Sequence, residues 1–197
     1  MQKFKLQVLI EVAIMAGLAL VLDLLPSIRL SASISISIAM VPVFLVALRW
    51  GAKAGMASGF LWGTLQVLMG DAWFVHPVQL IMEYFVAFTF IGFAGFFRNT
   101  IVQSYKTSNR GKGLVFLLIA ILVGSLSRYF WHIIAGTFFW AEAGASLGAA
   151  FWFALWTQGF TGIAAAVLCY FVLGILFGTA PRLLTQSVKS THIPVSK

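Results

Sequence analysis

The sequence predicts an all-α integral membrane protein, a single bundle of six transmembrane helices with both termini in the cytoplasm. Three observations predict it. Of the 197 residues, 61% are hydrophobic and 9% are charged, and the mean hydropathy is +0.99. At roughly 20 apolar residues per crossing, this length holds about six helices and no separate soluble domain. The third observation is that the basic residues gather in alternate connections.

The first two predicted helices cover about residues 6–25 and 36–48. In the first, Ala13 and Gly17 are four residues apart and form a flat face for a second helix, either inside the bundle or from a partner subunit. Between the two helices, residues 27–37 alternate serine with apolar residues. This period of two predicts an extended segment, which either folds over a site as a lid or begins the second helix irregularly.

The third and fourth predicted helices cover about residues 54–69 and 77–97. The third repeats glycine at four-residue intervals, which favours close helix packing. Trp62 and Gln66 lie on its later half. The fourth begins at a proline, which suits a first helical turn, and carries Glu83 and Tyr84 about two turns further on.

A polar connection is expected over 98–112, followed by the fifth and sixth helices at about 114–139 and 150–177. The fifth places two ionisable side chains at membrane depth, where such groups are costly and usually functional. In a helix, Arg128, His132, Gly136 and Trp140 follow one another at intervals of four and form a drifting stripe on one face. This stripe could line a pocket.

The net charge of +8 is explained by topology rather than by nucleic acid, which we do not expect as a partner. The N-terminus, the turn at 49–53, the 98–112 connection and the C-terminal tail hold every Lys and Arg except Arg29 and Arg128. By the positive-inside rule this side is cytoplasmic. The lone Cys169 excludes an intramolecular disulfide. We therefore expect a multi-pass protein of the cell membrane.

Four of the predicted helices send polar or aromatic groups to one level in the outer half of the bilayer. Glu83 and His132 both fall roughly 9 to 12 Å below the outer surface. A carboxylate among tryptophans suits a flat organic cation, so we expect an outward-facing pocket for such a ligand. The candidate ligand-binding residues are Glu83, His132, Trp140, Tyr84, Trp62, Gly136, Arg128, Gln158, Trp156 and Gln66.

Other interpretations of these residues stay open at this point. Glu83 could pair with Arg128 and hold two helices together, His132 could be a neutral core histidine, and the tryptophans could serve packing. A stand-alone proton-coupled carrier of a small organic cation would use Glu83 or His132 as its protonating group. A hydrolase or metalloenzyme is disfavoured because the chain has no HExxH or GxSxG motif. We expect no enzyme activity, metal or cofactor.

Several stretches resemble the thiamine-specific S components of energy-coupling-factor (ECF) transporters, and the resemblance covers essentially the whole chain. They are EVAIMAGLALVLD in the first helix, the turn ALRWGAKAG, FLWG with the later GD, IMEY before AFTFIGFAGF, and YFWHIIAG with the following Trp140. The resemblance implies a six-helix binding subunit that captures thiamine at its outer face. It also implies docking on a transmembrane scaffold subunit coupled to two cytosolic ATPase subunits.

The resemblance also implies roles for particular residues. Glu83 would face the cationic ligand, with His132 and Trp140 stacked on it and Trp62 and Tyr84 completing an aromatic wall. In this family the small residues of the first helix, here Ala13 and Gly17, meet the scaffold.

The chain departs from the family pattern within the pocket. It has Arg128 where family members have lysine, Phe153 near a family tyrosine, Gln158 in place of asparagine, and SASIS where the first loop has a tryptophan. Phe153 cannot donate a hydroxyl hydrogen bond, and Gln158 reaches one methylene further than asparagine. The expected ligand is therefore thiamine or a close analogue or precursor.

Overall fold

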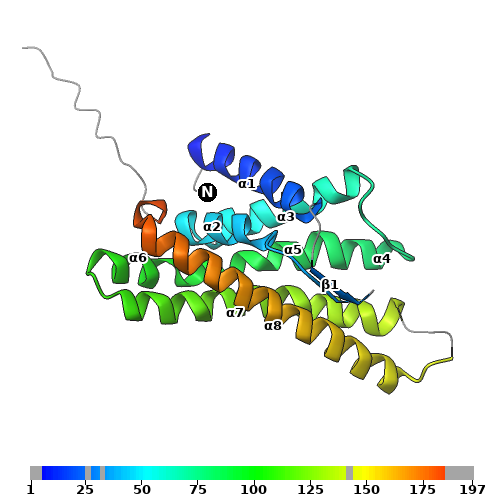
Figure 1. Cartoon of the computed structure of the whole chain (residues 1–197). Coiled ribbons are helices and arrows are strands. Elements are labelled where there is room, and N and C mark those ends of the chain that lie inside the picture. The colour runs from blue at the N-terminus through cyan, green and yellow to red at the C-terminus, as the bar shows by residue number, and fades with distance from the viewer. Residues whose placement is uncertain (1–5, 25–27, 32–33, 141–143, 185–197) are drawn as a thin grey trace, which may run out of the picture.

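The protein folds as a bundle of helices that run side by side (Figure 1). The structure is a computed structural model that describes residues 6–24, 28–31, 34–140 and 144–184. Its helical bodies are α1 (Leu6–Leu24), α2 (Met40–Trp50), α3 (Ala52–Leu68), a continuous fourth helix from Pro77 to Lys106, α7 (Arg110–Phe139) and α8 (Leu147–Thr179). The predicted all-α membrane bundle of six helices is confirmed.

The fourth helix changes its hydrogen-bonding pattern along its length. Its parts are α4 (Pro77–Leu80), a π-helix η1 (Ile81–Val86), α5 (Ala87–Phe90), a 3₁₀-helix η2 (Ile91–Phe97) and α6 (Arg98–Lys106). Within the described residues, α1, this fourth helix, α7 and α8 are long and apolar enough to cross a membrane, whereas α2 is a shorter apolar helix of 11 residues. Gly51, with φ +98°, makes the tight turn from α2 into α3.

The prediction of a polar connection over 98–112 is wrong for its first part, because α6 continues the fourth helix to Lys106. Ile101 and Ser104 of α6 are buried, and Arg98 Nε donates to the backbone oxygen of Arg49 at 2.7 Å. Packing of one face thus keeps this polar stretch helical. The turn that remains is short, and the Asn109 side chain accepts from the Lys112 N–H at 3.2 Å to begin α7.

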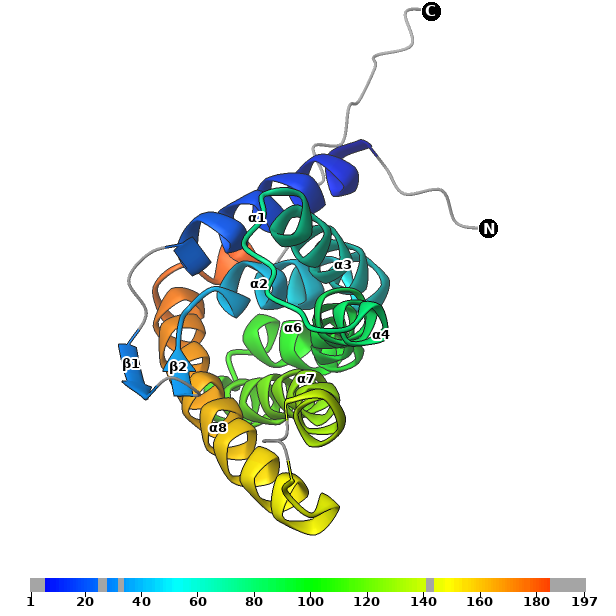
Figure 2. The same ribbon diagram turned by 90° about the vertical axis from the view of Figure 1, so that its right-hand side faces the viewer.

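The period-two segment between the first two helices forms a β-hairpin. Strands β1 (Ile28–Ser31) and β2 (Ile34–Ile36) are antiparallel, with Ile28 opposite Ile36. The extended conformation predicted there is confirmed. The hairpin lies beside α8 (Figure 2), while residues 25–27 and 32–33 lie outside the described residues. Its role as a lid stays a prediction.

The glycines of α3 lie flush against the backbone of the fourth helix. A methyl group added to Gly63 would overlap the carbonyl oxygen of Tyr84, and one added to Gly59 would overlap that of Phe88. Gly55 meets Gly92 at the next level, where a methyl group added to Gly55 would lie 3.0 Å from the Gly92 Cα. The close packing predicted from the glycine spacing is therefore confirmed, and it fixes the height of Tyr84 relative to α3.

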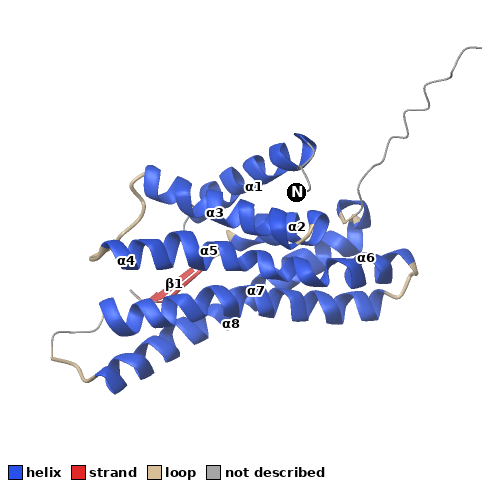
Figure 3. Cartoon of the chain, turned by 180° about the vertical axis from the view of Figure 1, so that it is seen from behind, coloured by secondary structure: helices blue, strands red, loops and turns tan. Residues whose placement is uncertain are grey.

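One end of the bundle is held together by a network of ionic and polar contacts. The start of α1, the α2–α3 turn, the α6–α7 turn and the end of α8 lie at one end, and the α3–α4 connection lies at the other (Figure 3). At the first end, Arg49 Nε lies 3.0 Å from Glu11 Oε2, and Trp50 Nε1 donates to the same oxygen at 2.6 Å. Arg49 Nη1 also donates to Leu183 O at 2.9 Å, just after α8. This network ties α1, α2 and the end of α8 together.

Candidate ligand-binding site

The Glu83 carboxylate is the centre of a polar cluster between the fourth helix and α7. Gln79 Nε2 donates to Glu83 Oε2 at 2.7 Å. On the other oxygen, Trp140 Nε1 donates at 3.3 Å and His132 Nδ1 lies at 3.5 Å. Only 10% of the Glu83 side chain is exposed. A carboxylate held this way is pre-oriented by its donors and needs little rearrangement to meet a cation.

His132 connects this carboxylate to Arg128. Arg128 Nε donates to His132 Nε2 at 3.4 Å, which requires a lone pair on that nitrogen. The proton of the neutral imidazole is then on Nδ1, the atom facing Glu83. The hypothesis of a direct Glu83–Arg128 ion pair does not match this geometry, because among the described residues Glu83 pairs with His132. Arg128 reaches the carboxylate only through the ring.

Aromatic rings surround the Arg128 guanidinium. Its central carbon lies 4.2 Å from the ring centre of Phe88, 5.0 Å from that of Trp62 and 5.5 Å from that of Tyr129. Trp62 is fully buried and packs edge-on against Phe88 at 4.4 Å between ring centres. Contacts between the cation and the ring faces partly replace the water that this half-buried guanidinium loses. Arg128 therefore adds a charged group to a layer of side chains that is otherwise aromatic.

The π-helix Ile81–Val86 presents Glu83 and Tyr84 to different neighbours. Glu83 turns to α7, whereas the Tyr84 carbonyl lies against Gly63 of α3. Tyr84 Oη accepts from the Trp73 N–H at 3.0 Å and lies 3.4 Å from the Trp73 carbonyl oxygen. π-Helical turns are rare and occur often at functional sites. Here the wider π turn contains Glu83, the residue whose carboxylate points from this helix to α7.

The segment before the fourth helix packs on the end of α7. Trp73 lies against Trp140, with 4.8 Å between ring centres, and His76 stacks on Phe139 at 5.3 Å. Trp140 follows the last residue of α7 and has φ −107° and ψ 4°. It therefore leaves the helical path, which allows its indole N–H to reach Glu83.

A second polar group lies at the C-terminal end of α1. Asp23 accepts hydrogen bonds from Gln66 Nε2 and from Ser37 Oγ. Gln66 Oε1 and the indole nitrogen of Trp62 are buried and have no hydrogen-bond partner within the described part of the chain. These two atoms lie one turn apart on α3, and among the described residues their hydrogen-bonding capacity is unused.

Most of the predicted site residues come together, and some do not. Glu83, His132, Trp140, Arg128, Trp62 and Tyr84 form one connected cluster, and Gln66 lies one turn from Trp62. Trp156 points outward with 73% of its surface exposed. A methyl group at Gly136 would lie 3.1 Å from Ala154 Cβ, so this glycine lets α7 approach α8. Gln158 is half-buried on α8.

The two small residues of α1 lie on its outward side. Ala13 is exposed, and nothing lies within 4 Å of a methyl group added to Gly17. The packed side of α1 is formed instead by Val8, Val12 and Ala16, among others. Of the two interpretations of the small residues, packing inside the bundle is therefore disfavoured.

Sequence reasoning missed Gln79, Asp23, Trp73 and Phe88. Gln79 precedes Glu83 by four residues, the spacing at which helical side chains meet, so this rule would have identified it. Asp23 contacts Gln66, 43 residues further along the chain, and no local pattern links the two. No local signal indicated the contact of Phe88 with Arg128, because it depends on how α3, α5 and α7 pack.

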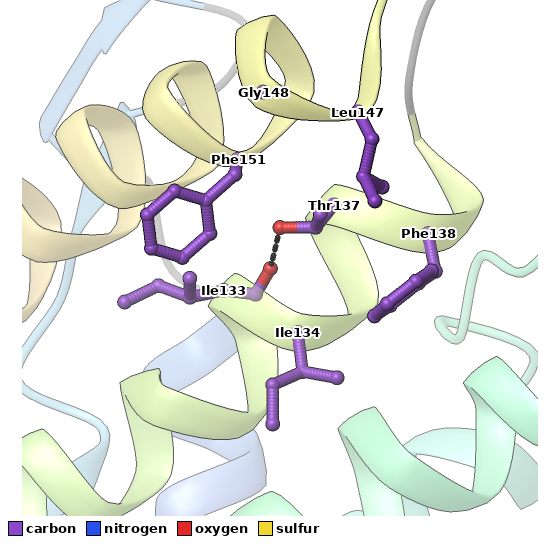
Figure 4. Close-up of a pocket in the computed structure, with 7 residues that line it drawn as sticks. All are labelled: Ile133, Ile134, Thr137, Phe138, Leu147, Gly148 and Phe151. Atoms are coloured by element: carbon purple, nitrogen blue, oxygen red, sulfur yellow. Dashed lines mark hydrogen bonds between the residues drawn. The ribbon is translucent and has the colours of Figure 1, made fainter.

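A cavity of about 390 Å³ lies away from this cluster, between the end of α7 and the start of α8 (Figure 4). Its lining is apolar apart from Thr137, whose hydroxyl donates to the Ile133 carbonyl oxygen at 2.7 Å. Among the described lining residues, no polar group is left to orient a small polar ligand there. Within the described residues, no three His, Cys, Asp or Glu side chains gather to hold a metal ion.

Comparison with known proteins identifies the family. The family described as "Thiamine transporter protein" matches residues 9–185. The chain belongs to this family. Thiamine transporter ThiT of Bacillus subtilis is 40% identical over 179 residues, which cover 89% of this chain and 93% of that protein. ThiT of Lacticaseibacillus paracasei is 31% identical over 188 residues, 93% of each chain.

A solved structure of ThiT from Listeria monocytogenes has the same fold. The TM-score is 0.86 at 33% identity, and the match covers 92% of this chain and 98% of that one. Thiamine transporter proteins are transporters rather than enzymes, so the family assigns a transport role to this multi-pass membrane protein.

Proposed function

We propose that the protein is the membrane-embedded substrate-binding subunit of an ECF-type ATP-driven importer, and that it captures thiamine or a close analogue or precursor from the extracellular side. The observation that best supports this proposal is the position of the Glu83 carboxylate, which contacts Gln79, His132 and Trp140 and lies beside an aromatic layer. Thiamine combines a cationic thiazolium ring with an aminopyrimidine, so it offers a charge to the carboxylate and flat faces to the indoles. Relatives named thiamine transporters support this ligand.

The proposal includes a partner surface and an orientation. Ala13 and Gly17 lie on the outward side of α1, where a transmembrane scaffold subunit with two cytosolic ATPases would dock. Both termini are cytoplasmic in this proposal, because the basic residues of the described chain concentrate at the end that holds the α6–α7 turn.

The experiment follows ligand binding to purified protein by quenching of tryptophan fluorescence. Glu83→Gln keeps the size of the side chain and removes its charge. We expect it to weaken thiamine binding by roughly 10- to 100-fold, the cost of losing a partly buried charge pair, and to change binding of an uncharged pyrimidine analogue much less.

Glu11→Gln is the matched control, because Glu11 is also a membrane-embedded carboxylate but pairs with Arg49 at the other end of the bundle. Its affinity for thiamine should equal that of the wild type. Absence of saturable quenching by thiamine or its precursors in the wild type would reject the ligand, and equal losses for the charged and neutral compounds would reject the charge pairing.

A further inference from the structure

Gln79 is a fully buried side chain whose amide is bonded at both ends. Its Nε2 donates to Glu83 Oε2 at 2.7 Å, and its Oε1 accepts from the Val75 N–H at 2.9 Å. A backbone N–H can only donate and a carboxylate only accepts, so one orientation of the amide satisfies both neighbours. Gln79 thus joins the carboxylate of the site to the main chain of the preceding segment.

That segment, residues 71–76, is attached to the site by few contacts. Trp73 and Val75 are 74% and 59% exposed, so burial of apolar surface holds it only weakly. Tyr84 Oη binds the Trp73 backbone, and the Trp73 ring lies on Trp140. Both Glu83 oxygens therefore reach the segment, Oε2 through Gln79 and Oε1 through Trp140.

We propose that Gln79 is a positioning residue that couples the state of the Glu83 carboxylate to the ordering of segment 71–76. The proposal rests on the proposed function, since it assigns the segment the task of retaining the ligand that pairs with Glu83. A charged Glu83 carboxylate accepts a strong hydrogen bond from Gln79 Nε2 and thereby fixes Gln79 Oε1 in position to accept from the Val75 N–H. Loss of that charge weakens the first hydrogen bond, so the orientation of the amide is less fixed and segment 71–76 becomes less ordered.

Two substitutions and a control test the two hydrogen bonds of the Gln79 amide separately. Gln79→Leu removes both bonds, Val75→Pro removes only the donor from the segment, and Gln103→Leu changes an exposed glutamine of the same helix as a control. We expect Gln79→Leu to weaken thiamine binding by at least about tenfold. Val75→Pro should mainly speed dissociation, and Gln103→Leu should behave as wild type.

Hydrogen–deuterium exchange of the peptide covering 71–76 is the decisive readout. In ligand-free protein, exchange should rise in Gln79→Leu and also in Glu83→Gln, although Glu83 reaches the segment only through other side chains. Glu83 also reaches the segment through Trp140 and Trp73, so Glu83→Gln is measured in the Gln79→Leu background as well. If Glu83→Gln leaves exchange at the wild-type level, or raises it as much in the Gln79→Leu background as alone, Gln79 does not carry the linkage and the proposal is overturned. In the Gln79→Leu/Glu83→Gln double variant, the losses of affinity should not add, because both act on one linkage.

Failure of this proposal is distinguishable from failure of the proposed function. If the wild type binds no thiamine, the ligand assignment fails, while exchange in the ligand-free variants still decides the linkage. If the wild type binds thiamine and Glu83→Gln leaves exchange of 71–76 unchanged, the linkage fails and the ligand assignment stands.

Discussion

His132 lies between two groups of opposite charge, and each of its ring nitrogens has a defined partner. Nδ1 faces Glu83 at 3.5 Å and Nε2 accepts from Arg128 at 3.4 Å. The imidazole therefore links the half-buried Arg128 guanidinium to the carboxylate without bringing the two charges into contact. Such a spacer leaves the carboxylate available to an incoming cation.

Amide replacements test the two nitrogens of His132 separately. Asparagine places an N–H near the position of Nδ1, and glutamine places its polar atoms near the position of Nε2. We expect His132→Asn to lose affinity for thiamine only a few-fold and His132→Gln to lose roughly tenfold or more, because only the former keeps a donor for Glu83. Titration by fluorescence quenching measures both, and equal or tighter binding by His132→Gln would contradict the assignment.

The four-residue spacing in the sequence of α7 predicted part of the site. It predicted that Arg128 and His132 are neighbours, because side chains four residues apart on a helix lie close together. Each further step of four drifts by about 40°, so Gly136 turns towards α8. Trp140 still reaches Glu83 because α7 has ended before it. That departure from the helix depends on the fold and not on the spacing.

Among the elements, the glycine face of α3 sets the position of the fourth helix. Gly59 and Gly63 contact the backbone of residues that belong to the site or lie beside it, namely Phe88 and Tyr84. This contact was predictable because glycine repeated every four residues has few other uses in a membrane helix. The π-helical and 3₁₀-helical turns of the same helix were not, since they arise from packing and have no residue signature.

Enlarging Gly59 should therefore damage both stability and binding. We expect Gly59→Ala to lower the free energy of unfolding by about 1–3 kcal/mol, because the methyl group overlaps the Phe88 carbonyl oxygen. Gly159→Ala in α8 is the control, since nothing lies within 4 Å of the added methyl group. Thermal unfolding in detergent compares the two, and equal stability of both variants would show that α3 can move away at little cost.

For the whole molecule, composition and charge placement were sufficient to predict a single helical bundle. They did not predict that α6 stays helical, because the burial of Ile101 and Ser104 against neighbouring helices is a property of the assembled fold. They also left α1 open to two interpretations. The structure shows that α1 packs on α2 and α3 with one side and leaves Ala13 on the other.

Bulky residues on that outward side should separate binding from transport. We expect Ala13→Leu with Gly17→Leu to bind thiamine as the wild type does but to lose co-purification with scaffold and ATPase subunits, and with it thiamine uptake by cells. Gly178→Leu, on an open part of α8, should keep both. Uptake into liposomes by this chain alone under a pH gradient would instead support the proton-coupled carrier.

The π-helix Ile81–Val86 has a consequence for how this site can evolve. A π turn is what one extra residue produces within an α-helix, and it is less stable than the regular helix around it. Deleting one residue there would restore regular bonding and rotate Gln79 by about 100° relative to α5. The span would still cross the bilayer, with more stable backbone bonding, but Gln79 and Phe88 of α5 could no longer both lie at the site as they do now. At the π turn, the geometry that serves ligand recognition is therefore not the one that gives the most stable helix.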